Sequence, residues 1–236
     1  MNARMTSGTI IRMKALGVAS ILALAACGSA DDAVTTAAAE SGERSAVELP
    51  TDRAEGDAGA PVTVIEYASV SCGACGNWAN TVYPEFKERF IDTGEVRYIF
   101  REFPAGNQQL FMTGSIIANC ADRKNPGAFL PNIKLQFERQ NEIFRYAQQA
   151  PEQLRDQYFF IAEQGGLSEE ETLQCLTEDA DAIREEMEER WQLGFDAGVT
   201  GTPGFIVNGV YKPGLFEIDE FEAAIAEAKG EAPDEG

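Results

Sequence analysis

Residues 62–78 read Val-Thr-Val-Ile-Glu-Tyr-Ala-Ser-Val-Ser-Cys-Gly-Ala-Cys-Gly-Asn-Trp, and this stretch decides the fold of the chain. Its first part, Val62 to Tyr67, is mostly β-branched or aromatic and ends at small residues, which predicts a β-strand. The second part contains a Cys-x-x-Cys pair, Cys72 and Cys75. From Cys75 onward, apolar residues recur every four positions, which predicts a helix. The stretch therefore predicts a strand that leads into a cysteine pair at the start of a helix.

The predicted helix start gives the two cysteines different chemistry. Ser71 is a candidate N-cap, which would make Cys72 the first helical residue. Unpaired N–H groups and the helix dipole favour a thiolate at that position, and the thiolate is the reactive form of cysteine. We therefore predict that Cys72 attacks and Cys75 resolves. The alternatives are half of a zinc site or two incidental core cysteines, but the chain contains no histidine to complete a zinc site.

Two further segments predict strands of the same sheet. Residues 96–100 follow the first helix, which is expected to end near residue 91 with a kink at Pro84. A strand in this position is expected to run parallel to the first. Near the C-terminus, residues 205–211 predict a hairpin that turns at Asn208–Gly209, directly after Thr202 and Pro203. A final helix is expected from about residue 217 to 229.

Residues 107–197 show helical periodicity and no convincing strand pattern. Breaks at Asn125-Pro126-Gly127, near Pro151, and at Gly165–Gly166 divide the region into about four to six helices. Ser168 and Glu171 have the spacing of a capping box at the start of one of them. The region therefore predicts a helical segment inserted between two strand-rich parts.

The strand–CGAC–helix order, residues 96–104 and residues 198–210 together resemble the DsbA-like branch of the thioredoxin-fold thiol–disulfide oxidoreductases. The resemblance extends from about Pro61 to Lys229. It implies an α/β thioredoxin fold with an inserted all-helical subdomain, which would occupy 107–197 of a domain at 58–230. A Cys-x-x-Cys pair alone is weak evidence, whereas the pair followed by a later Thr-Pro strand is specific.

The resemblance also implies roles for three residues outside the cysteine pair. Glu66 lies six residues before Cys72, where thioredoxin-like proteins hold an acid beneath the disulfide, so it would exchange a proton with Cys75. The alternative is a solvated glutamate at a strand edge. The Thr202–Pro203 bond would be cis, with the ring facing the cysteines and keeping metal out. The Thr202 backbone would bind an extended substrate peptide, and the alternative is an ordinary trans proline.

The N-terminal part of the chain indicates export. Residues 1–26 have a basic start and an apolar run too short to span a bilayer, which is typical of a signal peptide. The run ends Leu24-Ala25-Ala26-Cys27, which resembles a bacterial lipobox, so Cys27 would become a lipidated N-terminus. The alternative is an ordinary secretory signal with Cys27 as a bystander. Residues 27–57 are polar and small, which predicts a disordered tether in the cell envelope.

The remaining cysteines, Cys120 and Cys175, both fall in the helical region. With Cys27 lipidated and the CGAC pair joined, these two are left over in an oxidising compartment, and we predict a structural disulfide between them. The alternative is two buried free thiols.

The formal net charge of −20 argues against binding nucleic acid or anionic lipid surfaces. The acidic residues 231–236 are expected to form a loose tail.

The function that these observations favour is thiol–disulfide exchange with protein thiols and disulfides, with no cofactor or metal. We expect an oxidase that a membrane redox partner reoxidises, in an envelope protein held by a lipid anchor. The family's strong oxidases usually carry a histidine between the cysteines, where this chain has Gly73 and Ala74. A reductase or isomerase of the same fold therefore stays open. A Cu(I)-binding or chaperone-like module and a purely structural CGAC disulfide are the alternatives from other classes.

Overall fold

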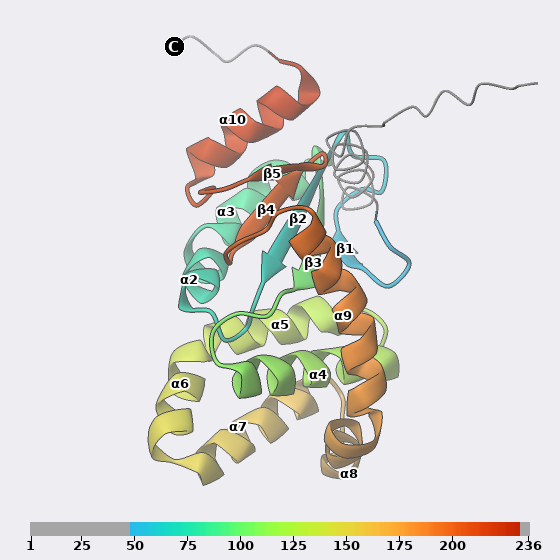
Figure 1. The fold of residues 1–236 in the computed structure, drawn as a ribbon, viewed down its shortest axis with the longest axis vertical. Helices are drawn as coiled ribbons and strands as arrows, with labels where there is room; N and C mark the ends of the chain where they lie inside the picture. The colour runs from blue at the N-terminus through green and yellow to red at the C-terminus, as the bar shows by residue number, and fades with distance from the viewer. Residues whose placement is uncertain (1–47, 232–236) are drawn as a thin grey trace, which may run out of the picture.

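The computed structural model describes residues 48–231, and its described residues form a mixed sheet with the strand order β1-β3-β2-β4-β5 (Figure 1). The sheet carries helices on its faces, and a group of helices lies at one end of it. The strands are β1 (Arg53–Glu55), β2 (Val62–Ala68), β3 (Val96–Glu102), β4 (Gly204–Val207) and β5 (Val210–Lys212).

Strand β2 lies at the centre of the sheet. It pairs parallel with β3 and antiparallel with β4. Nearly all of its side chains are buried, as expected for a central strand rich in β-branched residues. The predicted parallel strand pair is confirmed, and both strands extend slightly beyond their predicted ends.

The helical connection between β2 and β3 is divided where the sequence predicted a kink. It consists of α2 (Gly73–Thr81), α3 (Tyr83–Phe86) and the π-helical turn η1 (Lys87–Ile91). Pro84 lies in the first turn of α3. Backbone N–H groups in a first turn have no partner within the helix, so a proline there costs no helical hydrogen bond. The wider turn that follows is closed by a hydrogen bond from Asp92 N to Lys87 O at 2.9 Å.

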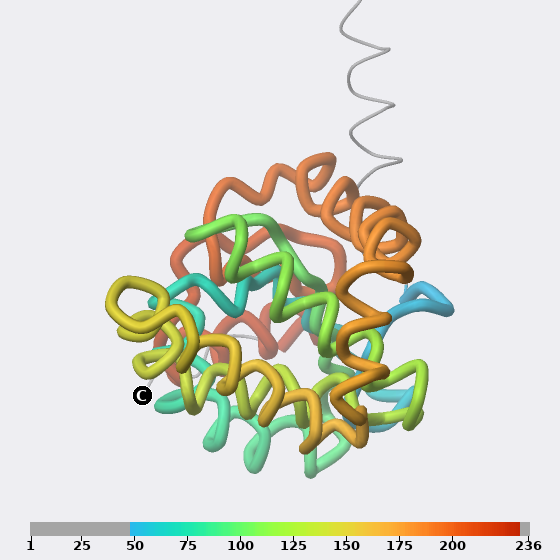
Figure 2. Tube along the Cα trace, turned by 90° about the horizontal axis from the view of Figure 1, so that it is seen from below, coloured from blue at the N-terminus to red at the C-terminus, as the bar shows by residue number. Residues whose placement is uncertain are grey.

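The segment between β3 and β4 is helical, as predicted. Its elements are α4 (Gln108–Lys124), α5 (Phe129–Glu138), α6 (Gln140–Gln149), α7 (Pro151–Gln164), α8 (Glu169–Gln174), the π-helical turn η2 (Cys175–Asp179) and α9 (Ala180–Asp196). Figure 1 shows α4 to α7 stacked together at the end of the fold opposite α10, and Figure 2 views the fold from the side of these helices. The predicted capping box is present, with the Ser168 hydroxyl accepting from Glu171 N and the Glu171 carboxylate accepting from Ser168 N.

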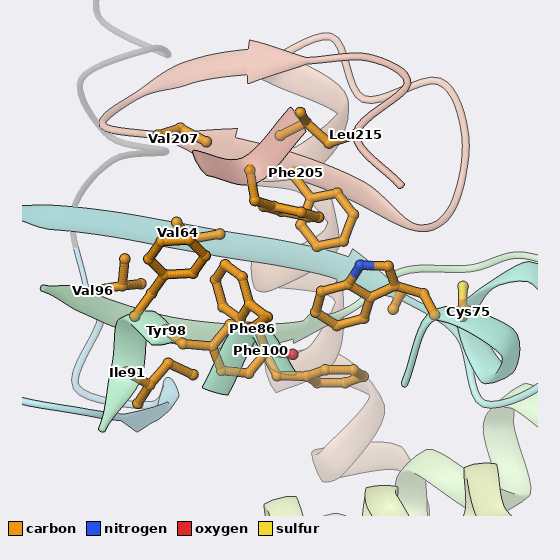
Figure 3. Packing of buried hydrophobic residues seen from close by; sticks show 14 of the residues in the cluster. Val64, Cys75, Phe86, Ile91, Val96, Tyr98, Phe100, Phe205, Val207 and Leu215 are labelled. Atoms are coloured by element: carbon orange, nitrogen blue, oxygen red, sulfur yellow. The ribbon is translucent and has the colours of Figure 1, made fainter. Parts of the chain in front are cut away.

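The last helix, α10 (Ile218–Lys229), covers the sheet near β2 and β4. Its Phe221 ring lies 4.8 Å from the Phe205 ring and 4.9 Å from the Phe86 ring, measured between centroids. These rings belong to a core of aromatic and aliphatic side chains that also buries Tyr98 and Cys75 (Figure 3). Packed aromatic rings of this kind supply much of the apolar area that stabilises a core.

The predicted tether boundary at residue 57 is wrong. The signal peptide 1–26, Cys27 and most of the tether lie outside the described residues, but residues 48–57 are part of the fold. Strand β1 pairs antiparallel with β3. Asp52, just before it, forms an ion pair with Arg101 at 2.7 Å, and both side chains are fully buried. Contacts with β3 and Arg101 thus order residues 48–57, although the polar composition of this segment alone predicted disorder. The predicted acidic tail lies outside the described residues from 232 onward.

Candidate active site

The cysteine pair lies at the junction of β2 and α2. Cys72 is the N-cap of α2, with an extended backbone, and its Sγ accepts a hydrogen bond from Cys75 N at 3.3 Å. The prediction that Ser71 caps the helix is wrong by one residue. The Ser71 hydroxyl donates instead to the carbonyl oxygen of Ala105 at 2.6 Å, which fixes the turn before Cys72 to the loop after β3.

The two thiols have opposite environments. Cys72 is half-buried, and the hydrogen bond from the Cys75 side chain is the main cause that lowers its pKa to about 6. Partial burial opposes this shift, while the Thr202 side chain and the backbone N–H groups of Ala74 and Cys75 reinforce it. Cys75 is fully buried, and burial raises its pKa well above the ordinary value. At neutral pH Cys72 is therefore mostly a thiolate and Cys75 a thiol.

The loop before β4 brings Thr202 and Pro203 to this pair. The Thr202–Pro203 peptide bond is cis. Cys72 Sγ lies 3.3 Å from the Thr202 carbonyl oxygen, across 130 residues of sequence, and donates a hydrogen bond to it when Cys72 is protonated. The β4–β5 hairpin that follows turns at Asn208 and Gly209, which both have positive φ angles, as its Asn-Gly sequence predicted.

Glu66 lies in β2, where it interacts electrostatically with Cys72 and Cys75, and it is 1% exposed, so it is not a solvated edge residue. In the sheet register it is aligned with Phe100 of β3 and Phe205 of β4. One carboxyl oxygen, Oε2, is hydrogen-bonded to the Tyr98 hydroxyl, and the other, Oε1, has no partner among the described residues. Burial raises the pKa of Glu66 to about 8, against the hydrogen bond from Tyr98. Glu66 is therefore mostly a neutral acid at pH 7.

Gln140, the first residue of α6, supports the site and was missed by the sequence analysis. Its side-chain amide donates to the carbonyl oxygens of Val70 and Cys72, both at 2.9 Å. A Cβ on Gly76 would approach the Gln140 Oε1 to 2.2 Å, so this contact requires glycine at position 76. These two hydrogen bonds hold the turn that carries Cys72 against the helical segment. A lone glutamine inside a helical pattern gives no signal of this role.

The other predicted cysteine pair lies away from the site. Cys120 on α4 and Cys175 on η2 are joined by a disulfide, with their Cα atoms 6.3 Å apart. Both belong to the core of the helical segment.

Among residues 48–231, no three histidine, cysteine or acidic side chains are grouped so that they could hold a metal ion. Over the same residues, no helix has the length and apolar character needed to cross a membrane.

The family model described as Thioredoxin matches residues 48–227. The chain belongs to this thioredoxin family. A protein of Rickettsia felis named "Putative protein-disulfide oxidoreductase" is 35% identical over 168 residues, which are 71% of this chain and 56% of that protein. A Rickettsia typhi protein of the same description is also 35% identical, over 58% of its length. The chain thus spans a little more than half of these curated relatives.

Solved structures identify the branch of the family. The crystal structure of alpha-DsbA1 from Wolbachia pipientis superimposes with a TM-score of 0.64 and 26% identity, covering 78% of this chain and 94% of that one. BdbD from Bacillus subtilis, in its oxidised form, shares the fold with a TM-score of 0.62 at 18% identity, covering 76% of this chain and 93% of its own. The expected DsbA-like thioredoxin fold with a helical insertion is therefore confirmed.

Proposed function

We propose that this protein is a thiol–disulfide oxidoreductase that exchanges disulfides with protein substrates through Cys72 and Cys75. The observation that carries the proposal is the pairing of a half-buried thiol of low pKa with a fully buried thiol of high pKa at one helix start. This is the arrangement that a nucleophilic and a resolving thiol require. The relatives named protein-disulfide oxidoreductases support the same activity.

In the oxidase direction, a substrate thiolate attacks Sγ of Cys72 in the Cys72–Cys75 disulfide. The bond between the two cysteines breaks, a mixed disulfide forms between substrate and Cys72, and Cys75 leaves as a thiolate. Glu66 gives its proton to Cys75. A second substrate thiolate then attacks the substrate sulfur of the mixed disulfide, and Cys72 leaves as a thiolate. The substrate gains a disulfide, and the protein keeps both electrons.

The Thr202 segment is the proposed docking site for the substrate. Its carbonyl oxygen lies 3.3 Å from Cys72 Sγ, so a peptide joined to Cys72 runs beside this backbone. An extended peptide there can hydrogen-bond to the Thr202 main chain as a short added strand. Such recognition uses main-chain groups and accepts many sequences, which fits a protein that acts on varied substrates.

The direction of exchange is proposed to be oxidation. The low pKa of Cys72 stabilises the reduced form, which makes the disulfide a better electron acceptor. This effect operates without the histidine that the family's strong oxidases carry, because hydrogen bonds from Cys75, Thr202 and the helix N-terminus supply it. A membrane redox partner would then remove the electrons.

The site of action is proposed to be the cell envelope. The DsbA-like relationship supports a location outside the cytoplasm, and the leader at 1–26 with Cys27 supports a lipid anchor. The tether then extends from residue 27 to the start of the fold near residue 48.

A redox titration against glutathione, followed by Trp78 fluorescence, tests the proposal. Trp78 lies in α2 with its ring packed in the core that buries Cys75, so it senses the state of the pair. We expect a reversible transition at about −120 to −180 mV, as for a disulfide donor. A potential near −270 mV would assign the protein to the reductases. No transition at all would overturn the proposed activity.

A further inference from the structure

Gln140 extends from the helical segment into the backbone of the cysteine turn. Its side chain is 6% exposed, and its Nε2 lies 2.9 Å from the carbonyl oxygens of both Val70 and Cys72. An amide group has two N–H donors, so one side chain can bind both carbonyls at once. These two carbonyl groups flank Ser71 in the sequence and are held towards the same nitrogen. Gln140 therefore fixes the backbone on both sides of Ser71.

The direction of the Cys72 carbonyl group decides how Cys72 relates to α2. Cys72 has a φ of −98° and a ψ of 118°, the extended backbone of an N-cap residue. The angle ψ sets the direction of a residue's own carbonyl group, so a hydrogen bond to that oxygen restrains ψ. With a helical ψ, Cys72 would join the helix and could not cap it. Gln140 thus favours the backbone in which Cys72 Sγ accepts from Cys75 N at 3.3 Å.

Hydrogen bonds of this kind favour the Cys72 thiolate. The Cys75 side chain is the main cause that lowers the pKa of Cys72, and the Thr202 side chain and backbone N–H groups at the helix start add to it. Gly73 and Ala74, between the cysteines, have no polar side chain to contribute. Hydrogen bonds weaken steeply when donor and acceptor lose their alignment. The stability of the thiolate therefore depends on how firmly the turn holds Cys72 in place.

The titratable groups around the turn come from three elements. Cys75 of α2 and Glu66 of β2 interact electrostatically with Cys72. At the start of α6, Arg139 Nη1 lies 3.1 Å from Glu142 Oε2, and both side chains are partly exposed. Opposite charges that pair in this way have a small net effect at a distance. A neutral substitution of the glutamine leaves all of these charges in place.

The two redox states benefit differently from this geometry. In the reduced protein, Cys72 Sγ accepts its hydrogen bond as an anion, and hydrogen bonds to ionised groups are roughly twice as strong as neutral ones. In the disulfide, the same sulfur carries no charge and gains less. A residue that holds Cys72 at the cap therefore stabilises the reduced pair more than the disulfide, which makes the disulfide a better electron acceptor.

We propose that Gln140 is a positioning residue for the exchange reaction, which holds Cys72 as the N-cap of α2 and thereby makes the Cys72–Cys75 disulfide more oxidising. The inference rests on the proposed function and extends it, because it assigns part of the direction of exchange to the helical segment. Gln140 acts through the backbone of the turn and does not touch the reacting sulfur atoms.

The test compares the full chain with Gln140→Leu, which keeps a side chain of similar size and removes both donors. The titration midpoint of Cys72, followed by thiolate absorbance, should rise from about 6 to about 7. The equilibrium constant for reduction by glutathione at pH 7 should fall by roughly five- to ten-fold, which corresponds to about 20–30 mV. Gln140→Met, whose unbranched side chain adapts to irregular space, replaces Gln140→Leu if that variant does not unfold cooperatively.

Gln136, four residues earlier on α5, is the matched control. Its side chain is also fully buried, and its Nε2 donates to a backbone carbonyl oxygen, that of Gly114, at 2.9 Å. A Cβ on Gly114 would approach Gln136 Oε1 to 2.1 Å, so the close contact with a glycine is repeated as well. Gln136→Leu should therefore lower the free energy of unfolding, as Gln140→Leu does, and leave the Cys72 midpoint and the potential unchanged.

Gly76 offers a second way to displace the amide. A Cβ there would approach Gln140 Oε1 to 2.2 Å, whereas alanine keeps the N–H that donates to the Cys72 carbonyl oxygen at 3.1 Å. Gly76→Ala should thus lower the potential in the same direction as Gln140→Leu. In a Gln140→Ala background the amide is absent, so Gly76→Ala should leave the potential unchanged.

Three results would overturn the proposal. The first is a Cys72 midpoint or a potential that stays at the parent value in the Gln140 variant that folds. The second is an equal shift in Gln136→Leu, which would indicate a general loss of packing. The third is an effect of Gly76→Ala that is the same with and without the Gln140 amide. The proposed exchange activity fails separately, by the lack of any redox transition in the parent, because the titration of Cys72 requires no turnover.

Discussion

Arg190 of α9 forms a buried ion pair with Glu102 at the end of β3, 88 residues earlier in the chain. Its Nε donates to Glu102 Oε2 at 2.9 Å, and a second guanidinium nitrogen donates to Oε1 at 3.0 Å. Burial opposes ionisation of Glu102, but the charge and hydrogen bonds of Arg190, with help from Asn119, hold its pKa below the usual value. The pair joins the helical segment to the sheet.

Arg190→Met should destabilise the protein by about 3–5 kcal/mol, because it leaves the Glu102 charge buried without compensation. Adding Glu102→Gln to the same chain should recover much of this loss. Urea unfolding of the single and double variants measures both effects. Arg123→Met is the control, since it breaks an exposed ion pair with Glu186 that should contribute under about 1 kcal/mol. Equal losses in Arg190→Met and Arg123→Met would contradict a specific role for the buried pair.

Cys72→Ala should abolish disulfide exchange, whereas Cys75→Ala should accumulate mixed disulfides through Cys72. The reason is that Cys72 is the half-exposed thiol of low pKa and Cys75 is buried and protonated. Gel analysis of trapped adducts under non-reducing conditions, together with an insulin reduction or peptide oxidation assay, makes the measurement. Full activity in Cys72→Ala would show that the roles are wrongly assigned.

The reactivity of reduced Cys72 should titrate with a midpoint near pH 6. Hydrogen bonds from Cys75, Thr202 and the helix N-terminus favour the thiolate, so alkylation by iodoacetamide should stay fast down to about that pH. Thiolate absorbance in the ultraviolet should follow the same curve and should disappear in Cys72→Ser. A midpoint near 8.5, the value of a free cysteine, would mean that these hydrogen bonds do not stabilise the thiolate.

The local signals in the sequence predicted the part of the site that is built from neighbouring residues. The strand before Cys72, the helix after it and the Asn208–Gly209 turn follow from periodicity and turn chemistry, which act over a few residues. The parallel pairing of β2 and β3 was also predictable, because two strands joined by a helix usually lie parallel in one sheet. The cap position was shifted by one residue because Ser71 and Cys72 can both cap a helix, and only the contact of Ser71 with Ala105 decides between them.

The remaining features depend on partners that sequence patterns do not reveal. Asp52 appeared to belong to a disordered tether because its polar neighbours cannot form a core, yet Arg101 compensates its charge. Arg190 lies in a highly charged helix, where an arginine usually marks a solvated face, and only the register of α9 against β3 buries it. Gln140 likewise acquires its role from the packing of α6 against the cysteine turn.

Removing the disulfide of the helical segment should lower stability without changing the redox chemistry of Cys72. The bond between Cys120 and Cys175 closes a loop of 55 residues, which corresponds to about 4 kcal/mol in the chain-entropy model. The double variant Cys120→Ala/Cys175→Ala should therefore unfold at lower urea concentration and keep the redox potential of the CGAC pair. A changed potential would show that this bond also shapes the active site.

Glu66→Gln should change how stability depends on pH. The pKa of Glu66 is raised to about 8 in the fold, compared with about 4.3 in an unfolded chain. The folded protein therefore binds one more proton than the unfolded chain between these values, and the contribution of the neutral acid is lost as pH rises from about 4.3 to 8. Glutamine stays neutral, so the stability of the variant relative to the parent should increase over this range by up to a few kcal/mol.

Unfolding curves at a series of pH values, measured for both proteins in a Cys72→Ser background, isolate this effect. The background is needed because the depressed pKa of Cys72 acts in the opposite direction, adding stability as pH rises from about 6 towards its unfolded value. Glu85→Gln, at an exposed position of α3, is the control and should show no such trend. A difference between Glu66→Gln and its parent that does not vary with pH would mean that Glu66 is already ionised in the fold, and it could not then give a proton to Cys75.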